Sequence, residues 1–421
     1  MRVKDLIKKY FYSPFFKHFL MYTNILLFTA ISYISLALDV RPPFNVINIA
    51  LVALFIVATI IFLIINKIRP RINVFVICVT GLMFCYILSY AINGFGEFPK
   101  TPVLITVFSL FLFLWLDANR KDIHFYLLGF LIASWMFLIT FAVFEHSAVL
   151  HPSFSKRVGV SLGNENDVAR HLVFAFLINV YYIYACKNKY LKAIFVFMCV
   201  LTTYFVFLTG SISNLLLLLL SIFIAAFYIS QKKTGIFITI SSIVLIGVII
   251  TLIFTVSFLS PIKDRILSIF ETVFKTGDVR PDSSAIGRYN AMVFGFRLFC
   301  ESPLFGNGYN SVVNSYMIMA HNNISEIGAD YGIFALLFEE LLIIYPVLRD
   351  EKAVEKGKLF TAIFGMYVFV IQMFLVVFNS KVELIVLPLM FIMTNEDVDL
   401  VPSFKSFFQR WKKDKVEVVE Q

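Results

Sequence analysis

Long apolar runs recur along this chain of 421 residues and constrain its fold more than any other feature. A helix needs about 20 predominantly apolar residues to cross a bilayer. Such spans are predicted at 17–38, 44–66, 72–93, 101–117, 123–144, 168–186, 190–209, 212–230, 235–258, 330–348, 358–378 and 382–394. Hydrophobic residues make up 60% of the chain and charged residues only 15%. A chain of this composition has too few polar residues to cover its apolar surface in water. The sequence therefore predicts an all-α polytopic membrane protein with about twelve transmembrane helices.

The lysine and arginine residues predict which loops face the cytoplasm. Most of the 36 lie in the N-terminal segment, in the C-terminal segment, or in alternate loops near 67–71, 120–121, 187–192, 232–233 and 349–358. This alternation predicts a multi-pass protein of the cytoplasmic membrane with both termini in the cytoplasm. The expected parts are helices over 1–259, an extracytoplasmic loop with amphipathic helices over 260–329, helices over 330–394, and a basic cytoplasmic tail over 395–421.

Two predicted outer segments carry positive charge against this bias. Arg170 lies near the end of the stretch "SLGNENDVARH" at 161–171, and the loop 260–329 contains Arg265, Arg280 and Arg288. A negatively charged ligand on the outer face is the simplest reason for these arginines, so an extracytoplasmic active face is expected. The alternatives are that long loops cross regardless of charge and that Arg170 extends to lipid headgroups.

The stretch 161–171 also predicts a helix start. Asn164 and Asn166 are turn and cap formers, and Asn166 or Asp167 is expected to cap the helix that follows. Arg170 then lies in the first turn, where a cation opposes the helix dipole unless both face an anion. We therefore expect Asn164, Asn166 and Arg170 to contact an anionic substrate.

A second outer helix is predicted at 286–300. Its spacing gives an apolar stripe that includes Ile286, Tyr289 and Phe296, with Arg288 off the stripe. Pro303 ends this pattern, and "GNGYN" reads as a turn. The expected arrangement is a helix in or near the outer interface with arginines above it.

A histidine precedes the next helix in "MAHNNISEIGADYG", residues 319–332. Ser325 and Gly328 share its side of that helix, and such small residues permit close approach by a partner or a ligand. His321 is suited to remove a proton near neutral pH. The alternative is a hydrogen-bonded interfacial histidine without a chemical role.

Four motifs occur in order: "GNENDVAR", "TGSISNLL", "GRYNAMVFGFRLFCESPLFGNGYNS" and "AHNNISEIGADYG". Over about residues 160–345, this order resembles the O-antigen ligase and polymerase family of membrane glycosyltransferases. The resemblance implies a GT-C-like helical fold. It also implies transfer of a sugar chain from a polyprenyl diphosphate carrier to an acceptor hydroxyl outside the cytoplasmic membrane, without metal, cofactor or nucleotide sugar. Many relatives carry an arginine at the helix start matching 209–214, and this chain does not.

The resemblance implies essential residues at Arg170, Arg288 and His321. Our hypothesis is that Arg170 and Arg288 hold the diphosphate, because guanidinium groups match phosphate oxygens and stay charged. His321 would take the acceptor proton, with Glu326 or Asn322 orienting it, and the anomeric centre would invert. His321, Arg288 and Glu326 are thus the predicted catalytic residues, and the predicted substrate-binding residues are Arg170, Asn164, Asn166, Arg265, Arg280 and Asn322.

Three functions remain open at this point. We favour a polymerase of surface polysaccharide, which uses another lipid-linked repeat as acceptor, over a ligase that transfers the chain to a lipid anchor. A flippase of lipid-linked sugars should carry charged residues at mid-membrane. The predicted helix interiors are nearly free of charge, with Glu339 and Glu340 as the exceptions, which favours an enzyme over a flippase. The expected partners are a polyprenyl-diphosphate-linked oligosaccharide, membrane lipid and a chain-length regulator protein, with no nucleic acid.

Overall fold

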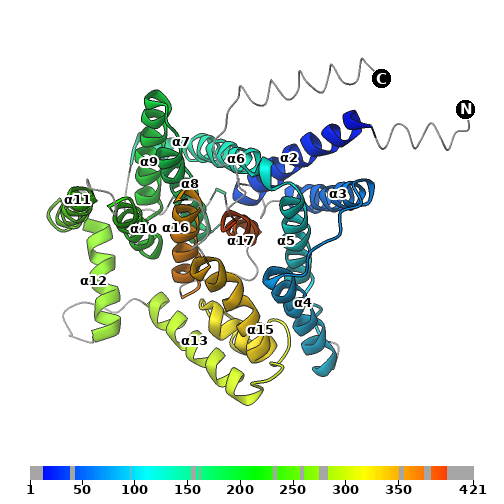
Figure 1. Ribbon diagram of the computed structural model, residues 1–421. Coiled ribbons are helices and arrows are strands. Elements are labelled where there is room, and N and C mark those ends of the chain that lie inside the picture. The colour runs from blue at the N-terminus through cyan, green and yellow to red at the C-terminus, as the bar shows by residue number, and fades with distance from the viewer. Residues whose placement is uncertain are drawn as a thin grey trace, which may run out of the picture.

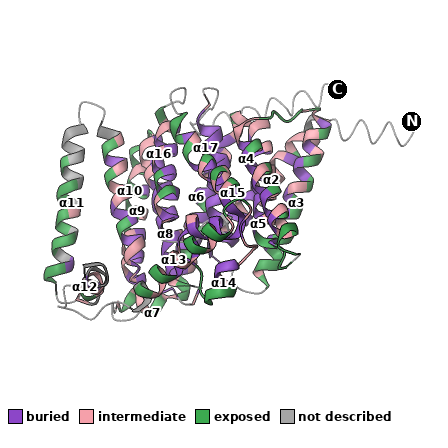
Figure 2. Ribbon diagram, turned by 90° about the horizontal axis from the view of Figure 1, so that it is seen from below, coloured by how far each residue is buried: buried purple, intermediate pink, exposed green. Residues whose placement is uncertain are grey.

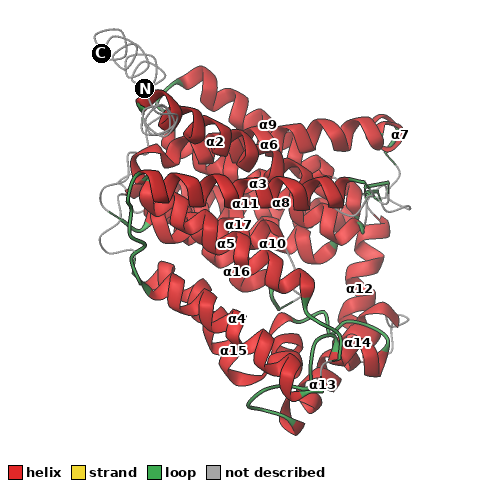
Figure 3. Ribbon diagram, turned by 90° about the vertical axis from the view of Figure 1, so that its right-hand side faces the viewer, coloured by secondary structure: helices red, strands yellow, loops and turns green. Residues whose placement is uncertain are grey.

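The computed structural model describes residues 13–37, 43–94, 96–152, 158–159, 161–162, 164–230, 235–256, 260–274, 283–349, 355–373 and 381–395. Within these ranges the chain forms helices and loops and no strand (Figure 3). The helices are α2 (Pro14–Ala37), α3 (Phe44–Ile65), α4 (Val74–Ile92), α5 (Lys100–Ala118), η1 (Arg120–Asp122), α6 (Ile123–Phe144), α7 (His146–Leu150), α8 (Glu165–Ala185), α9 (Lys189–Thr209), α10 (Ile212–Ser230), α11 (Gly235–Thr255), α12 (Ser260–Phe274), α13 (Ser283–Glu301), α14 (Ser311–Tyr316), α15 (Asn323–Leu348), α16 (Glu355–Ile371) and α17 (Lys381–Met393).

A helix lies at each of the ranges predicted to span the membrane. In the described part of the chain, eight helices are long and apolar enough to cross: α2, α3, α4, α5, α6, α8, α9 and α15. Their large apolar side chains include many on the surface, such as Leu54, Phe84 and Ile139, as expected where lipid is the solvent. The chain is therefore a multi-pass membrane protein. The assignment of α10, α11, α16 and α17 as further spans stays a prediction.

Helix α17 lies near the centre of the helices (Figure 1). It packs against α5, α16 and α2, and every residue from 382 to 393 is buried. A helix that is apolar on all sides belongs in the interior of a bundle. Glu383 breaks this pattern, because it is charged and has no exposed surface.

Polar contacts join helix ends that the sequence assigns to the same side of the membrane. At one end, Asn310 donates to Glu97 Oε2 at 3.0 Å. At the other end, the Tyr184 hydroxyl donates to Glu355 Oε2 at 3.2 Å. Figure 2 shows the first of these ends along its lower edge, where α7, α12 and α14 lie. These contacts agree with the predicted alternation of helix direction, and the membrane side of each end remains a prediction from the basic residues.

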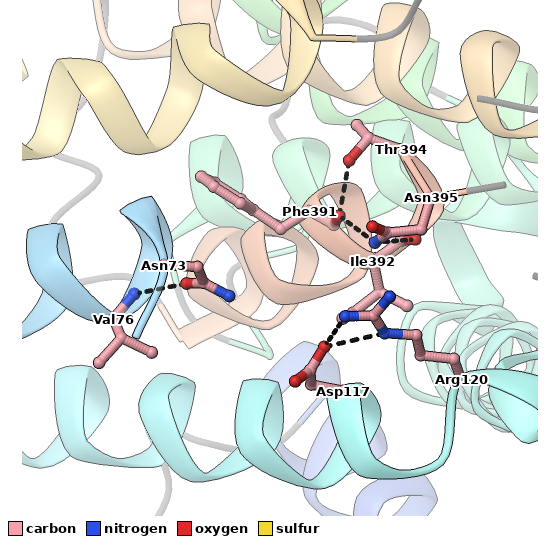
Figure 4. Close-up of polar contacts among 8 residues, drawn as sticks. All are labelled: Asn73, Val76, Asp117, Arg120, Phe391, Ile392, Thr394 and Asn395. Atoms are coloured by element: carbon pink, nitrogen blue, oxygen red, sulfur yellow. Dashed lines mark hydrogen bonds and ion pairs between the residues drawn. The ribbon is translucent and has the colours of Figure 1, made fainter. Parts of the chain in front are cut away.

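The end assigned to the cytoplasm has its own polar contacts (Figure 4). Asn73 caps α4 by accepting from the Val76 amide at 3.0 Å, and Arg120 pairs with Asp117. A cavity of about 860 Å³ opens here, lined by Ile68, Arg69, Arg71, Asp117, Ala118, Asn119, Arg120, Lys121 and Asp122. Positive charge is what the insertion bias predicts at this end, so the cavity by itself points to no ligand.

The predicted outer helices α12 and α13 lie across the direction of the long helices, which Figure 1 views nearly end-on. On α13, the predicted apolar stripe faces outward: Tyr289 is 61% exposed and Phe296 40% exposed. The opposite face packs on α15, because a Cβ on Gly295 would lie 3.2 Å from Ser325 Oγ. The expectation that small residues on the helix after His321 permit close approach is therefore confirmed, and the partner is α13.

Helix α15 starts at Asn323, close to the predicted helix start, and turns back on itself at Gly332. Gly332 has φ +80° and ψ −173°, which is not helical. The Asn323 side chain donates to Glu339 Oε1 at 3.0 Å, although residues so far apart in a straight helix would be separated by about 24 Å. The candidate span Asn323–Leu348 therefore consists of two arms, and the first arm folds back beside the second, 333–348.

A backbone clasp holds this turn, formed by the segments 303–308 and 329–333. The Asn307 amide donates to the Ala329 carbonyl at 2.7 Å, and the Ile333 amide donates to the Pro303 carbonyl at 2.8 Å. A Cβ on Gly306 would lie 2.3 Å from the Asp330 carbonyl carbon, and one on Gly332 would lie 2.3 Å from the Leu304 oxygen. The glycines of both sequence motifs are thus required by backbone-to-backbone contact.

Gly332→Ala is expected to lower the free energy of unfolding by about 3 kcal/mol or more, because the added methyl group meets backbone and the left-handed φ is strained. The thermal unfolding midpoint and the amount of protein in the membrane should both fall. Gly96→Ala is the matched control: a Cβ there has no neighbour within 4 Å. Equal stability of the two variants would contradict the clasp.

Candidate functional site

His321 sits on a strained loop between α14 and the first arm of α15. Its φ is +51°, a left-handed conformation that costs about 1–2 kcal/mol for a residue with a side chain. The loop before it rests on α13: Ile318 lies 3.9 Å from a Cβ placed on Gly287, and the rings of Tyr316 and Phe294 stack at 5.3 Å. Strain of this kind persists only where surrounding structure holds the residue in place.

Two charged side chains from different helices act on the imidazole of His321. Burial and the positive charge of Arg288 on α13 lower the pKa of His321, while the negative charge of Asp167 on α8 raises it. Since the net shift is downward, the imidazole is neutral at neutral pH. In the described part of the chain, no side chain or backbone group hydrogen-bonds to this ring. His321 therefore has the form that a general base requires.

Arg170 lies one turn below Asp167 on α8 and is buried. Its Nη2 lies 3.3 Å from Asp167 Oδ1, and its Nε lies 3.3 Å from Glu383 Oε1 on α17. Asp167 is thus shared between Arg170 and His321. Asp167 is paired with Arg170 and, like Arg288, influences His321 electrostatically, so side chains from α8, α13 and the loop before α15 lie within electrostatic range of one another.

Arg170 differs from the prediction in one respect: in the structure its positive charge is paired with two carboxylates of the protein, Asp167 and Glu383. Sequence reasoning missed Glu383, which lies far from Arg170 along the chain. A charged residue in the otherwise apolar run 382–394 was the only signal, and it names no partner. The headgroup alternative for Arg170 is wrong, since its side chain is only 9% exposed and is paired with carboxylates.

Glu326 and Asn322 support the backbone around His321. Glu326 Oε2 accepts from the amide of Ala320, the residue before His321, at 2.6 Å. Asn322 caps α15 by accepting from the Ser325 amide at 2.9 Å, and its side-chain amide donates to the Met373 carbonyl at 3.3 Å. In this arrangement both act on His321 through the loop that positions it.

Asn164 and Asn166 organise the start of α8. The cap is Asn164, whose side chain accepts from the Asn166 amide at 2.9 Å, so the expectation that Asn166 or Asp167 caps the helix is wrong. Asn166 is buried, and its Oδ1 accepts from the Ser211 hydroxyl at 2.9 Å. Asn214 donates to the Asn166 carbonyl at 3.0 Å. These contacts fix the start of α8 against that of α10.

Of the remaining predicted residues, Arg265 on α12 donates to the Gly210 carbonyl at 3.2 Å. It thereby brings a cation to the helix start at 209–214, which has no arginine of its own. Arg280 lies outside the described residues.

Asp330 is a residue of this region that the sequence reading missed. It is fully buried, and its carboxylate accepts from the amides of Asn310 and Ser311 at 2.9 Å and from the Ser311 hydroxyl at 2.7 Å. It therefore anchors the start of α14 to the turn of α15. The sequence around Asp330 does not indicate this role, because the role depends on the contact between the segments 303–308 and 329–333.

The turn of α15 at Gly332 accounts in part for the two glutamates, Glu339 and Glu340, in the interior of this helix. Glu339 accepts from Asn323 at the beginning of α15, and Glu340 Oε2 accepts from the Gln372 side chain at 3.2 Å. The Asn323 amide also donates to the Gln372 carbonyl at 2.8 Å. Glu339 therefore ties the first arm of α15 to the second arm, and Glu340 ties the second arm to the residue that follows α16.

The positive charge of this site comes from arginine. Among the described residues, no group of three or more His, Cys, Asp or Glu side chains is arranged to hold a metal ion. Two guanidinium groups beside a neutral imidazole can bind an anion and accept a proton.

Comparisons with known proteins agree with the motifs. The family model Wzy_C, described as O-Antigen ligase, matches residues 197–338, a range that includes Arg265, Arg288 and His321. "Teichuronic acid biosynthesis protein TuaE" of Bacillus subtilis (strain 168) is 26% identical over 219 residues, which is 47% of this chain and 43% of that relative. The chain thus aligns with less than half of the relative's length. The resemblance to the O-antigen ligase and polymerase family is confirmed.

Proposed function

We propose that this chain, similar to the O-antigen ligase family over residues 197–338, is a membrane glycosyltransferase that polymerises a surface polysaccharide. It transfers a glycan from a polyprenyl diphosphate carrier to a hydroxyl of another lipid-linked repeat. The proposal is supported by the electrostatic influence of Arg288 and Asp167 on His321, together with the ion pair between Arg170 and the same Asp167.

Each side chain then has a defined task. Arg170 and Arg288 bind the diphosphate, and their charge stabilises the negative charge that develops as the anomeric C–O bond breaks. His321 takes the proton of the acceptor hydroxyl, whose oxygen forms the new bond from the opposite face of the sugar. The products are the extended glycan, with inverted anomeric configuration, and the lipid diphosphate.

The apolar surroundings fit a lipid substrate. Tyr289 and Phe296 are exposed on the same helix as Arg288, and Met317 is 82% exposed on the loop that precedes His321. A prenyl chain lying in the membrane can pack against these side chains while its diphosphate reaches the arginines. The site then works at the extracytoplasmic face of the membrane, as the charge distribution predicts.

Deletion of the gene distinguishes a polymerase from a ligase. Loss of a polymerase should leave single repeats attached to the cell surface, seen as a short band on a gel of surface polysaccharide. Loss of a ligase should leave long chains on the lipid carrier. The second pattern would overturn the polymerase proposal in favour of transfer to an anchor, and normal surface polysaccharide would argue against both.

A further inference from the structure

We propose that Glu383 holds the Arg170 guanidinium in the empty site and takes up a proton when the donor diphosphate binds. This inference rests on the proposed function, because it concerns the same donor. Glu383 is a positioning residue: it acts through Arg170 and does not touch the sugar.

The first support is the confinement of Glu383. It has no exposed surface and lies at the start of α17, where residues 382–393 are all buried. Its carboxylate is therefore shielded from solvent. The groups that favour its negative charge are Arg170, whose Nε lies 3.3 Å from Oε1, and the backbone amide of Glu383 itself. An ionised carboxylate in such surroundings is stable only while that positive charge is available to it.

The second support is the number of negative groups that face Arg170. Asp167 Oδ1 lies 3.3 Å from Nη2, so two carboxylates already share one guanidinium. Among the described residues, Tyr367 is a titratable group beside Glu383, and its hydroxyl donates to the Arg170 carbonyl at 3.3 Å. His171, the next residue on α8, also interacts electrostatically with Arg170. On the α5 side, Ser109 contributes a neutral hydroxyl, which donates to the Leu384 carbonyl at 3.0 Å.

A bound diphosphate would add two negative charges to this group. The side chain of Asp167 is 42% exposed, so water can screen its negative charge, whereas Glu383 has no exposed surface. The proton therefore goes to Glu383: a solvent proton forms one O–H bond on its carboxyl group, and the guanidinium N–H groups turn to the phosphate oxygens. No bond of the donor breaks in this step. The proton leaves when the lipid diphosphate is released.

Calorimetry of the full chain in lipid nanodiscs tests this exchange. The probe is farnesyl diphosphate esterified to N-acetylglucosamine, a diester whose phosphate oxygens do not titrate near neutral pH. Binding measured in two buffers of different ionisation enthalpy gives the number of protons taken up. We expect the wild type to take up about one proton more than Glu383→Gln, and its Kd to rise about tenfold per pH unit once Glu383 is ionised in the empty site. The Kd of Glu383→Gln should lack this rise.

Two control variants isolate the effect. Glu340→Gln changes a glutamate on the second arm of α15 that is not among the charged groups acting on Arg170, and it should keep the proton uptake of the wild type. Glu383→Asp keeps a carboxyl group and should restore most of the uptake. A merely structural role for Glu383 would lower the unfolding temperature without changing the proton count.

The outcomes separate this inference from the proposed function. Equal proton uptake by the wild type and Glu383→Gln would overturn the role of Glu383. Proton uptake near zero in the wild type would overturn it as well, and this measurement requires no variant. If Arg170→Met binds the probe as tightly as the wild type, the proposed function itself loses its phosphate-binding arginine.

Discussion

Arg288→Ala is expected to abolish polymer formation and to lower kcat/KM by about 10²–10³-fold or more. Loss of one preorganised charge at the position where negative charge develops has an effect of this size. Surface polysaccharide from cells that carry only the variant should show single repeats on a gel. The rate of lipid diphosphate release by the purified variant gives the magnitude.

Two further substitutions define what Arg288 supplies. Arg288→Lys keeps the charge but loses the two-pronged geometry, so it should recover only part of the activity. Arg297 is exposed on the same helix and serves as the matched control, since Arg297→Ala should retain nearly full activity. Polymer of normal length from Arg288→Ala, at normal abundance in the membrane, would remove Arg288 from the site.

His321→Ala is expected to lower kcat by about 10²–10⁴-fold, the usual contribution of a positioned general base. Binding of the donor should change little, because the imidazole acts on the acceptor. A turnover assay with saturating donor separates the two quantities. A variant with normal kcat and weakened donor binding would assign His321 to binding instead.

The dependence of kcat/KM on pH tests the role of His321 as a base more specifically. His321 must be neutral to accept a proton, and burial together with Arg288 holds its pKa below the ordinary 6.5. The acid limb of kcat/KM should therefore lie below pH 6.5, with a flat profile through neutral pH. In Arg288→Met the lost positive charge should raise the pKa of His321 and move this limb to higher pH. An unmoved limb would show that the two side chains do not interact.

The helices were predictable because their apolar runs are long and the membrane leaves few alternatives. The turn of α15 was not, since it depends on Gly332 meeting Leu304 from another motif. From the sequence alone, "GNGYN" is predicted only as a turn. Its meaning lies in the amides of Asn307 and Gly308, which donate to the carbonyls of Ala329 and Asp330 across the clasp.

The candidate site divides in the same way. Arg288 and His321 stand out in sequence because charge and imidazole are rare in such an apolar chain. Asn166 also stood out, yet its amide oxygen is used by Ser211 within the scaffold. Glu383 could not be assigned, because its partner Arg170 lies on another helix far away along the chain. Sequence thus indicates which residues carry chemistry, and the fold decides which of them face one another.

Turnover by the purified chain tests the central claim most directly. The chain would be incubated with a synthetic polyprenyl-diphosphate-linked repeat, without nucleotide sugar and in the presence of a chelator, and its products followed by mass spectrometry. We predict chains of increasing length, one lipid diphosphate released for each bond formed, and neither product from the Arg288→Ala, His321→Ala double variant. No release by the wild type, or equal release by the double variant, would contradict the account.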